Sequence, residues 1–200
     1  MNNDKSNTRV NNASPGPLTV SIIINNYNYE LFLGQAIDSA LNQDYPYVDV
    51  IVVDDGSQDS SVDIIHRYGD RIRPVIKENG GQASAMNAGF QASSGDLVLF
   101  LDADDYLFPD AVTTIIAAWS QDIVQSHARL KLVDIEGGHI DLYPAPEIKF
   151  DQGDVTPLLL EKGRYNTSVT SGTCFSREVL AEILPIPESD FRISADGYLV

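Results

Sequence analysis

The sequence predicts an α/β fold built on a mostly parallel central sheet that is flanked by helices. Two observations support this fold class. Continuous apolar runs of strand length recur through the first part of the chain, and each is followed by a stretch with apolar residues at helical spacing. Continuous apolar runs are typical of strands that are covered on both faces. Strand–helix alternation with short connections places helices on both sides of a parallel sheet.

The alternation begins with the run LTVSIII and ends with a helix that reaches Trp119. Asn28 is the expected N-cap of the first helix, Ser57 caps the second helix, and Gly69 ends it. Pro109 is expected in the first turn of the fourth helix. The elements are, in order, a strand over 18–24, a helix over 30–43, a strand over 48–53, a helix over 57–68, a strand over 73–78, a helix over 82–93, a strand over 96–101 and a helix over 109–119.

The second part of the chain has a less regular pattern. Gly137-Gly138 is a turn signal between two extended runs. Pro157 is compatible only with the first turn of a helix. The expected elements are two extended runs over 122–144, a helix over 154–163, a strand over 168–176 and a helix over 177–184.

Composition and charge indicate one soluble domain behind a polar lead. The chain has 200 residues, with 29 Asp and Glu against 13 Lys and Arg, and a formal net charge of −16. This charge argues against binding to nucleic acid or to anionic membranes. No run approaches the ~20 apolar residues that span a bilayer, so we expect no membrane segment and a cytoplasmic location. Residues 1–17 predict a flexible tail rather than a signal peptide.

Polar clusters follow all four strands of the first part. Each cluster alone could be an ordinary turn, as Asp55-Gly56 and Asn79-Gly80 illustrate. Ligands of open α/β sheets bind beyond the carboxyl ends of the strands, where these clusters are expected to meet. The clusters are Asn25 to Asn28, Asp54 to Ser57, Glu78 to Gly81 and Asp102 to Asp105.

The last cluster places Asp102 and Asp104 directly after the apolar run LVLFL. Carboxylate oxygens suit Mg²⁺ or Mn²⁺, which commonly use one or two protein carboxylates together with substrate phosphates. The alternative is that Asp104 or Asp105 caps the helix that begins near Pro109. The Asp-x-Asp pair therefore predicts a cation site, with helix capping as the competing interpretation.

Several other kinds of site lack their motifs in this sequence. Neither G-x-x-x-x-G-K-[ST] nor G-x-G-x-x-G occurs, which argues against the usual NTPase and dinucleotide sites. H-E-x-x-H, C-x-x-C and G-x-S-x-G are also absent, so a zinc site or a serine hydrolase has little support. The single cysteine, Cys174, forms no internal disulfide and is expected in the core.

The order of the motifs resembles the inverting glycosyltransferases of family 2, which have the GT-A fold. The resemblance rests on VSIIINNYNYELFLGQAIDSALNQ, VIVVDDGSQDSS, ENGGQASAMNAGFQASSGDLVLFLDADD and SADGYL, and it covers residues 18–200. It implies transfer of a sugar from a nucleotide-diphosphate sugar to an acceptor hydroxyl. It also implies a nucleotide-sugar-binding half over 18–108 and an acceptor-side half over 109–200.

The resemblance also implies a role for each matching residue. Asp55 contacts the nucleobase, and Asp102 and Asp104 contact the ribose and a divalent ion, Mn²⁺ or Mg²⁺, on the diphosphate. Asp196 is the general base that accepts the acceptor proton. The residues expected to bind the nucleotide sugar are Asn25, Asn26, Tyr27, Asp54, Asp55, Asn79, Gly80, Asn87, Asp102, Ala103 and Asp104.

The chain departs from the family pattern at two positions. Met86 precedes Asn87 where the family usually has a basic residue, and Ala195 precedes Asp196 where it often has a glutamate. The chain also stops at Val200, which predicts a truncated domain of a larger protein. These departures leave open a non-catalytic donor-binding or scaffolding domain. A sugar nucleotidyltransferase is a further alternative, although NNYNYE stands where that class has a glycine-rich basic loop.

The donor and acceptor are only partly indicated. An aspartate beside the nucleobase favours a ring N–H, which uracil, thymine or guanine could supply, and a UDP-sugar is preferred. The acceptor could be a carbohydrate, a lipid-linked molecule or a protein, and polysaccharide biosynthesis is the expected context.

Overall fold

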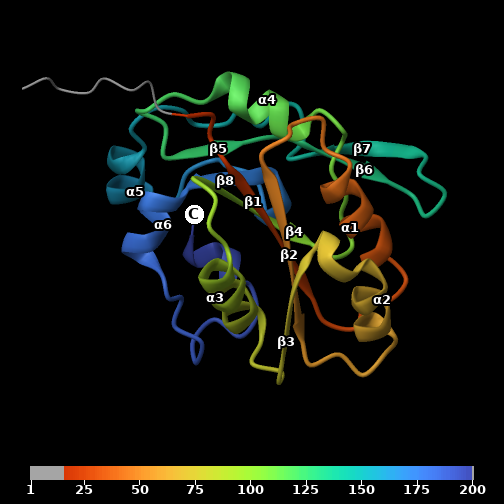
Figure 1. The fold of residues 1–200 in the computed structure, drawn as a ribbon. Coiled ribbons are helices and arrows are strands. Elements are labelled where there is room, and N and C mark those ends of the chain that lie inside the picture. The colour runs from red at the N-terminus through yellow and green to blue at the C-terminus, as the bar shows by residue number, and fades with distance from the viewer. Residues whose placement is uncertain (1–15, 200) are drawn as a thin grey trace, which may run out of the picture.

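The computed structural model describes residues 16–199 and confirms the α/β fold class. Most of the expected tail lies outside these residues. A six-stranded sheet runs through the molecule with helices on both faces (Figure 1). Its strands are, in spatial order, β3 (Arg73–Lys77), β2 (Val48–Asp55), β1 (Val20–Asn26), β4 (Leu97–Asp102), β8 (Thr173–Ser176) and β5 (Gln125–His127).

The sheet is parallel from β3 to β4, and β8 is antiparallel to both of its neighbours. Cys174 of β8 is buried, and this burial raises the pKa of its thiol to about 12, as expected of a core residue. A separate antiparallel hairpin of β6 (Leu130–Val133) and β7 (His139–Tyr143) confirms the two extended runs. Within residues 16–199, no helix combines the length and the apolar character that crossing a bilayer requires.

Two apolar layers hold the helices against the sheet. Side chains alternate along β1, so Ile22 and Ile24 pack into one layer and Ile23 into the other. The first layer contains residues of α1, α2 and α4, and the second contains residues of α3 and α6. The helices are α1 (Leu33–Leu41), α2 (Ser61–Tyr68), α3 (Gln82–Ala92), α4 (Ala111–Ala118), α5 (Thr156–Lys162) and α6 (Arg177–Ile183), with short 3₁₀ turns η1 (Gly69–Arg71), η2 (Thr170–Gly172) and η3 (Ala195–Tyr198).

The expected caps of the first two helices are wrong. Phe32 precedes α1 and Ser60 precedes α2, and neither makes a side-chain cap. Asn28 instead accepts a hydrogen bond from the Gln58 N–H (2.7 Å). The Ser57 hydroxyl accepts one from the Asn28 N–H (2.9 Å). Asn28 and Ser57, which the sequence predicts as helix caps, instead join the loops after β1 and β2.

Other expected boundaries are partly correct. Gly69 ends α2 with φ of 54°, and Pro157 lies at the start of α5, as predicted. Pro109 is wrong as a first-turn residue, because α4 begins at Ala111 and the Pro109 carbonyl accepts from the Asp44 N–H (2.9 Å). Neither Asp104 nor Asp105 caps α4, whose N-cap is Asp110 without a side-chain bond. The expected strand over 168–176 shortens to β8, because residues 170–172 form η2.

Two helical glycines provide a matched test of the packing between helix and sheet. A Cβ on Gly89 of α3 would lie 3.1 Å from Val53 Cγ2 and closer still to Ile23 Cγ2. A Cβ on Gly34 of α1 would meet only the Tyr68 hydroxyl at 3.7 Å. We expect Gly89→Ala to lower the free energy of unfolding by about 1–3 kcal/mol, because the core is overpacked. Gly34→Ala should raise it by about 0.5–1 kcal/mol, because alanine favours the helix.

Urea unfolding monitored by circular dichroism gives both free energies. An unchanged or higher free energy of unfolding in Gly89→Ala would contradict the close contact between α3 and the sheet.

Candidate active site

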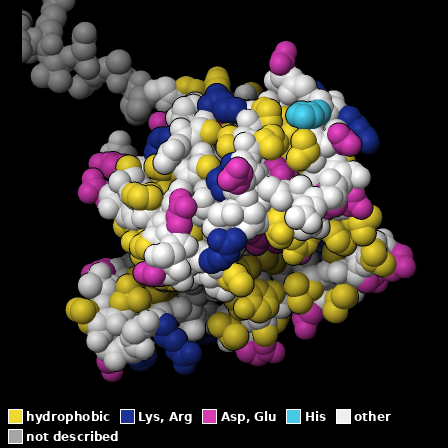
Figure 2. All heavy atoms as spheres, turned by 90° about the horizontal axis from the view of Figure 1, so that it is seen from below, with side chains coloured by type: hydrophobic (Ala, Val, Ile, Leu, Met, Phe, Trp, Pro, Cys, Tyr) yellow, Lys and Arg dark blue, Asp and Glu magenta, His cyan; other side chains and the backbone are white. Residues whose placement is uncertain are grey.

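The carboxyl ends of the parallel strands surround a cavity of about 580 Å³. The strand register brings the polar clusters together here, since Asn25 lies opposite Asp102 and Asn26 lies opposite Asp54. Figure 2 views the molecule from below, the side toward which β3 runs, and shows this face hollowed, with hydrophobic, basic and acidic side chains around the hollow. The lining residues are Asn25, Asn26, Tyr27, Tyr29, Asp55, Asn79, Gly81, Gln82, Asp102, Ala103, Asp104, Arg192 and Ile193.

The end of β1 contributes a side-chain amide without a partner. Both polar atoms of the Asn25 side chain are buried and form no hydrogen bond with other described residues. Asn26 is fixed, since its Nδ2 donates to Asp54 Oδ2 (2.7 Å) and Ser57 Oγ (3.1 Å). Tyr27 is 44% exposed at the cavity. A buried amide left unpaired costs about 1–3 kcal/mol, which makes Asn25 a candidate for bonding a ligand.

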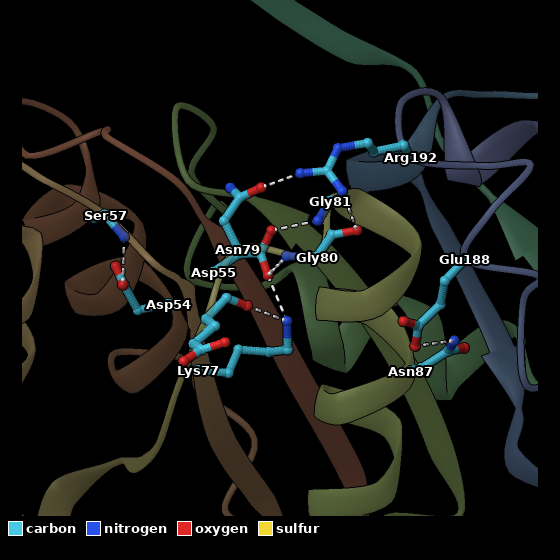
Figure 3. Close-up of polar contacts among 11 residues, drawn as sticks. Asp54, Asp55, Ser57, Lys77, Asn79, Gly80, Gly81, Asn87, Glu188 and Arg192 are labelled. Atoms are coloured by element: carbon cyan, nitrogen blue, oxygen red, sulfur yellow. Dashed lines mark hydrogen bonds and ion pairs between the residues drawn. The ribbon is translucent and has the colours of Figure 1, made fainter.

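Asp54 and Asp55 at the end of β2 have different surroundings (Figure 3). Asp54 is completely buried and accepts from Asn26 and from the Ser57 N–H (2.9 Å). It therefore supports the cavity wall from behind. Asp55 lines the cavity and forms an ion pair with Lys77 Nζ (2.6 Å).

The turn after β3 wraps around the Asp55 carboxylate. The Gly80 N–H donates to Oδ1 (2.9 Å) and the Gly81 N–H donates to Oδ2 (2.7 Å). Gly81 has φ of +91°, a conformation that favours glycine. Asn79 and Gly81 line the cavity, whereas Gly80 contributes through its N–H bond to Asp55.

Acidic side chains gather at the end of β4. Burial is the main cause that raises the pKa of Asp102 to about 7. The neighbouring carboxylates of Asp105, Asp104 and Asp196 raise this pKa as well. The charge of Asp104 also raises the pKa of Tyr29. The end of β4 is therefore a region where a cation would relieve repulsion among carboxylates.

This cluster is not a complete metal site by itself. Among residues 16–199, no group of three or more His, Cys, Asp or Glu side chains is placed to hold a metal ion. Asp104 also borders a second cavity of about 450 Å³, which lies between β4, α4 and β6. Asp104 therefore borders both cavities.

The raised pKa of Asp102 predicts an unusual dependence of stability on pH. The folded state keeps a proton on Asp102 up to about pH 7, whereas the unfolded chain loses it near the ordinary pKa of 3.8. The free energy of unfolding therefore falls as pH rises through this window. Asp102→Asn should raise it by on the order of 4 kcal/mol at alkaline pH and have little effect near the ordinary pKa of an aspartate.

Urea titrations of the wild type and the variant, without divalent cations, measure this difference. The exposed Asp122 is the control, and Asp122→Asn should leave the pH profile unchanged. If Asp102→Asn changed the free energy of unfolding equally at alkaline pH and near the ordinary pKa of an aspartate, Asp102 would not be buried among other carboxylates as described.

The segment Phe191–Ala195, which we call the strap, closes one side of the first cavity. Its backbone carbonyls accept from α3, with Gln82 N–H bonded to Arg192 O (2.9 Å) and Ala83 N–H to Phe191 O (3.3 Å). The Ala195 N–H donates to Gln82 Oε1 (2.9 Å). The strap leads into η3, which positions Asp196 close enough for its charge to raise the pKa of Asp102.

Asn87 and Met86 support the site without lining the first cavity. The buried Asn87 amide donates to Ile186 O (2.9 Å) and accepts from the Ile186 N–H (2.8 Å). These bonds hold the chain that leads to the strap. Met86 and Ala195 are completely buried in the apolar layer beneath α3. Neither departure from the family pattern therefore leaves a vacant position in the cavity wall.

The predicted binding residues did not include several residues of the cavity wall, which are Tyr29, Gly81, Gln82, Arg192 and Ile193. Arg192 is the notable omission, because its Nη2 donates to Asn79 Oδ1 (2.6 Å) (Figure 3). Because Arg192 lies 113 residues after Asn79, no local sequence pattern could predict this contact.

Comparison with known proteins identifies a family and relatives of this chain. The family model for Glycosyl transferase family 2 matches residues 21–184. An uncharacterized glycosyltransferase of Nostoc sp. is 36% identical over 189 residues, which are 92% of this chain and 58% of that protein. An uncharacterized glycosyltransferase of Haemophilus influenzae is 37% identical and is covered over 51% of its length. The chain thus spans between half and two thirds of these relatives.

Solved structures share the fold at low sequence identity. The mannosyltransferase PcManGT of Pyrobaculum calidifontis, in complex with GDP-Man and Mn²⁺, aligns with a TM-score of 0.61 at 19% identity, over 90% of this chain and 50% of that one. TarS of S. aureus in complex with UDP aligns with a TM-score of 0.58 at 18% identity, over 90% and 53% of the two chains. The expected GT-A fold is confirmed.

Proposed function

The chain belongs to glycosyltransferase family 2, and from that premise we propose that it transfers a sugar from a nucleoside diphosphate donor to an acceptor hydroxyl with inversion. The observation that carries the proposal is the cavity at the strand ends. It combines the unpaired Asn25 amide with the acidic end of β4. Ligands of open α/β sheets bind at this edge.

We assign the donor to this cavity. PcManGT and TarS, which share the fold, carry GDP-Man with Mn²⁺ and UDP in their structures. Asn25, Tyr27 and Asp55 would contact the nucleoside, with Asn79 and Gly81 beside it. Asn26, Asp54, Gly80 and Asn87 would act by holding these contacts in place.

The carboxylates at the end of β4 fit a divalent cation shared with the diphosphate. Asp102 and Asp104 offer hard oxygen ligands, and Asp102 lies in a setting that disfavours its charge without a cation. Mg²⁺ commonly binds one or two protein carboxylates together with substrate phosphates, and two carboxylates are what the end of β4 would offer. When bound, the ion would act as a Lewis acid on the phosphate oxygens.

Asp196 is the proposed general base. As the acceptor oxygen forms its bond to the anomeric carbon, the bond from that carbon to the diphosphate oxygen breaks, and the acceptor proton moves to Asp196. The two bonds change on opposite faces of the carbon, so the configuration inverts. We assign the acceptor to the half over 109–200, which lines much of the cavity of about 450 Å³ that Asp104 shares with the donor cavity.

A non-catalytic donor-binding domain is the competing proposal. Met86 favours it, because this buried apolar side chain occupies a position where the family usually has a basic residue. Both proposals predict nucleotide binding and differ in turnover.

The experiment that tests the function begins with thermal shifts for a panel of nucleotide sugars in the presence of Mn²⁺, since binding to the folded state raises its stability. The donor with the largest shift is then incubated with candidate acceptors, and free nucleoside diphosphate is measured. Acceptor-dependent release supports the transferase. If a nucleotide sugar binds but no candidate acceptor causes release of nucleoside diphosphate, the non-catalytic domain is favoured. If no nucleotide sugar binds, both proposals are contradicted.

A further inference from the structure

The second cavity, of about 450 Å³, has mostly apolar walls. Leu99, Leu101 and Cys174 line it with buried side chains that belong to the first apolar layer of the sheet. Ile115 of α4 and Leu132 of β6 line it as well. Sites for small molecules commonly have volumes in this range, apolar walls and a small number of polar groups. The cavity therefore has the size and the lining of a small-molecule site.

Some apolar side chains of this wall are open to solvent. Phe108 is 52% exposed and Leu132 is 41% exposed. On α4, Ala118 lines the cavity and is also exposed. An apolar group bound here would remove this surface from water, which is favourable.

The basic side chains of the cavity offer little to an anionic ligand. Burial lowers the pKa of His127, which favours its neutral form. Lys131 lies on the exposed surface of β6. The Arg129 guanidinium is already bonded to backbone carbonyl oxygens after β7, which are those of Pro144, Ala145, Pro146 and Ile148.

The carboxylates of Asp104, Asp105 and Asp110 line the same cavity. Asp104 also lines the donor cavity, so it marks the side of the second cavity that lies toward the donor. An ionised carboxylate accepts hydrogen bonds from hydroxyl groups and repels other anions. A hydroxylated, uncharged group therefore suits this side of the cavity, and an apolar group suits the wall formed by the sheet.

We propose that the acceptor is a small uncharged amphiphile, whose hydroxylated head lies at Asp104 and whose single apolar chain or ring system occupies the cavity of about 450 Å³. This inference rests on the proposed function and names the class of acceptor. The same carboxylates disfavour an acceptor that carries a phosphate next to its apolar part.

Calorimetric titration of the whole chain with octyl β-glucoside, methyl β-glucoside and octyl phosphate tests the proposal, with each octyl compound kept below its micelle concentration. The wild type should bind octyl β-glucoside at least about tenfold more tightly than methyl β-glucoside, since each buried methylene favours binding roughly fourfold. Octyl phosphate should bind at least about tenfold more weakly than octyl β-glucoside, because its charge faces carboxylates.

Two matched pairs of variants locate the bound apolar group. Ala118→Phe fills part of the cavity from α4, whereas Ala117→Phe places the same side chain at an exposed neighbour that does not line it. Leu132→Ser makes the β6 wall polar, whereas Ile140→Ser changes an exposed residue of β7 outside the cavity. Ala118→Phe and Leu132→Ser should each weaken octyl β-glucoside at least about fivefold, and the two controls should keep the wild-type affinity.

Three results would overturn the proposal. They are equal wild-type affinities for the two glucosides, tighter binding of octyl phosphate than of octyl β-glucoside, and equal affinities for octyl β-glucoside in the cavity variants and their controls. Sedimentation tests a different occupant, since a wild-type dimer that Ala118→Phe dissociates would place a second copy of the chain at this cavity and also overturn the proposal.

Titration of the wild type with UDP and with GDP in the presence of Mn²⁺ reports separately on the proposed function. Failure of both nucleotides to bind would overturn the proposed function. If a nucleotide binds and octyl β-glucoside shows no preference over methyl β-glucoside, this inference alone is overturned.

Discussion

Asp196→Asn is expected to lower the rate of sugar transfer about 10²–10⁴-fold, which is the usual contribution of a general base. The amide has nearly the shape of the carboxylate but does not accept the acceptor proton. The strap should keep its position, because its bonds to α3 come from the main chain of Phe191, Arg192 and Ala195. Donor affinity should therefore change by less than about twofold. A tenfold change would correspond to about 1.4 kcal/mol of binding free energy.

Initial rates of nucleoside diphosphate release and calorimetric titration of the donor give the two quantities separately. Asp190→Asn is the matched control, since Asp190 is an exposed aspartate just before the strap and accepts only from Ser189 Oγ (2.9 Å). It should leave both quantities unchanged. If Asp196→Asn transferred sugar at the native rate, the general base would have to be another residue.

The double change Asp102→Asn and Asp104→Asn is expected to abolish metal-dependent binding of nucleoside diphosphate. The two amides keep the size of the side chains and remove the charges that would hold the shared cation. Calorimetry measures the loss of affinity directly, and each tenfold loss corresponds to about 1.4 kcal/mol of binding free energy.

The control for the double change is Asp122→Asn, which removes a negative charge from an exposed loop. Affinity should be measured with Mn²⁺ and with a chelator. The wild type should bind more tightly with Mn²⁺, and the double variant should show one low affinity under both conditions. Equal gains from Mn²⁺ in both proteins would contradict the assignment of Asp102 and Asp104.

The parts of this molecule that could be predicted from sequence depend on local or repeating patterns. The apolar runs that became β1, β2 and β4 are buried on both faces, so their sequence alone distinguishes them from amphipathic strands. The strand register then explains why the polar clusters converge, because Asn25 and Asp102 end neighbouring parallel strands.

The parts that could not be predicted depend on contacts between distant segments. Ser57 has the chemistry of a cap, but the loop after β1 competes for its hydroxyl. Asn87 matches a donor-binding position in the family, yet its amide is bonded to Ile186, 99 residues later. The contact of Arg192 with Asn79 likewise depends on the strap that docks on α3. No periodicity or motif encodes such pairings.

The most direct test of the account is a crystal structure of the chain grown with Mn²⁺ and the nucleoside diphosphate that binds most tightly. We expect the nucleotide in the cavity of about 580 Å³, with its base at Asp55 and its phosphates toward Asp102 and Asp104. A nucleotide bound elsewhere, with this cavity empty, would contradict the account.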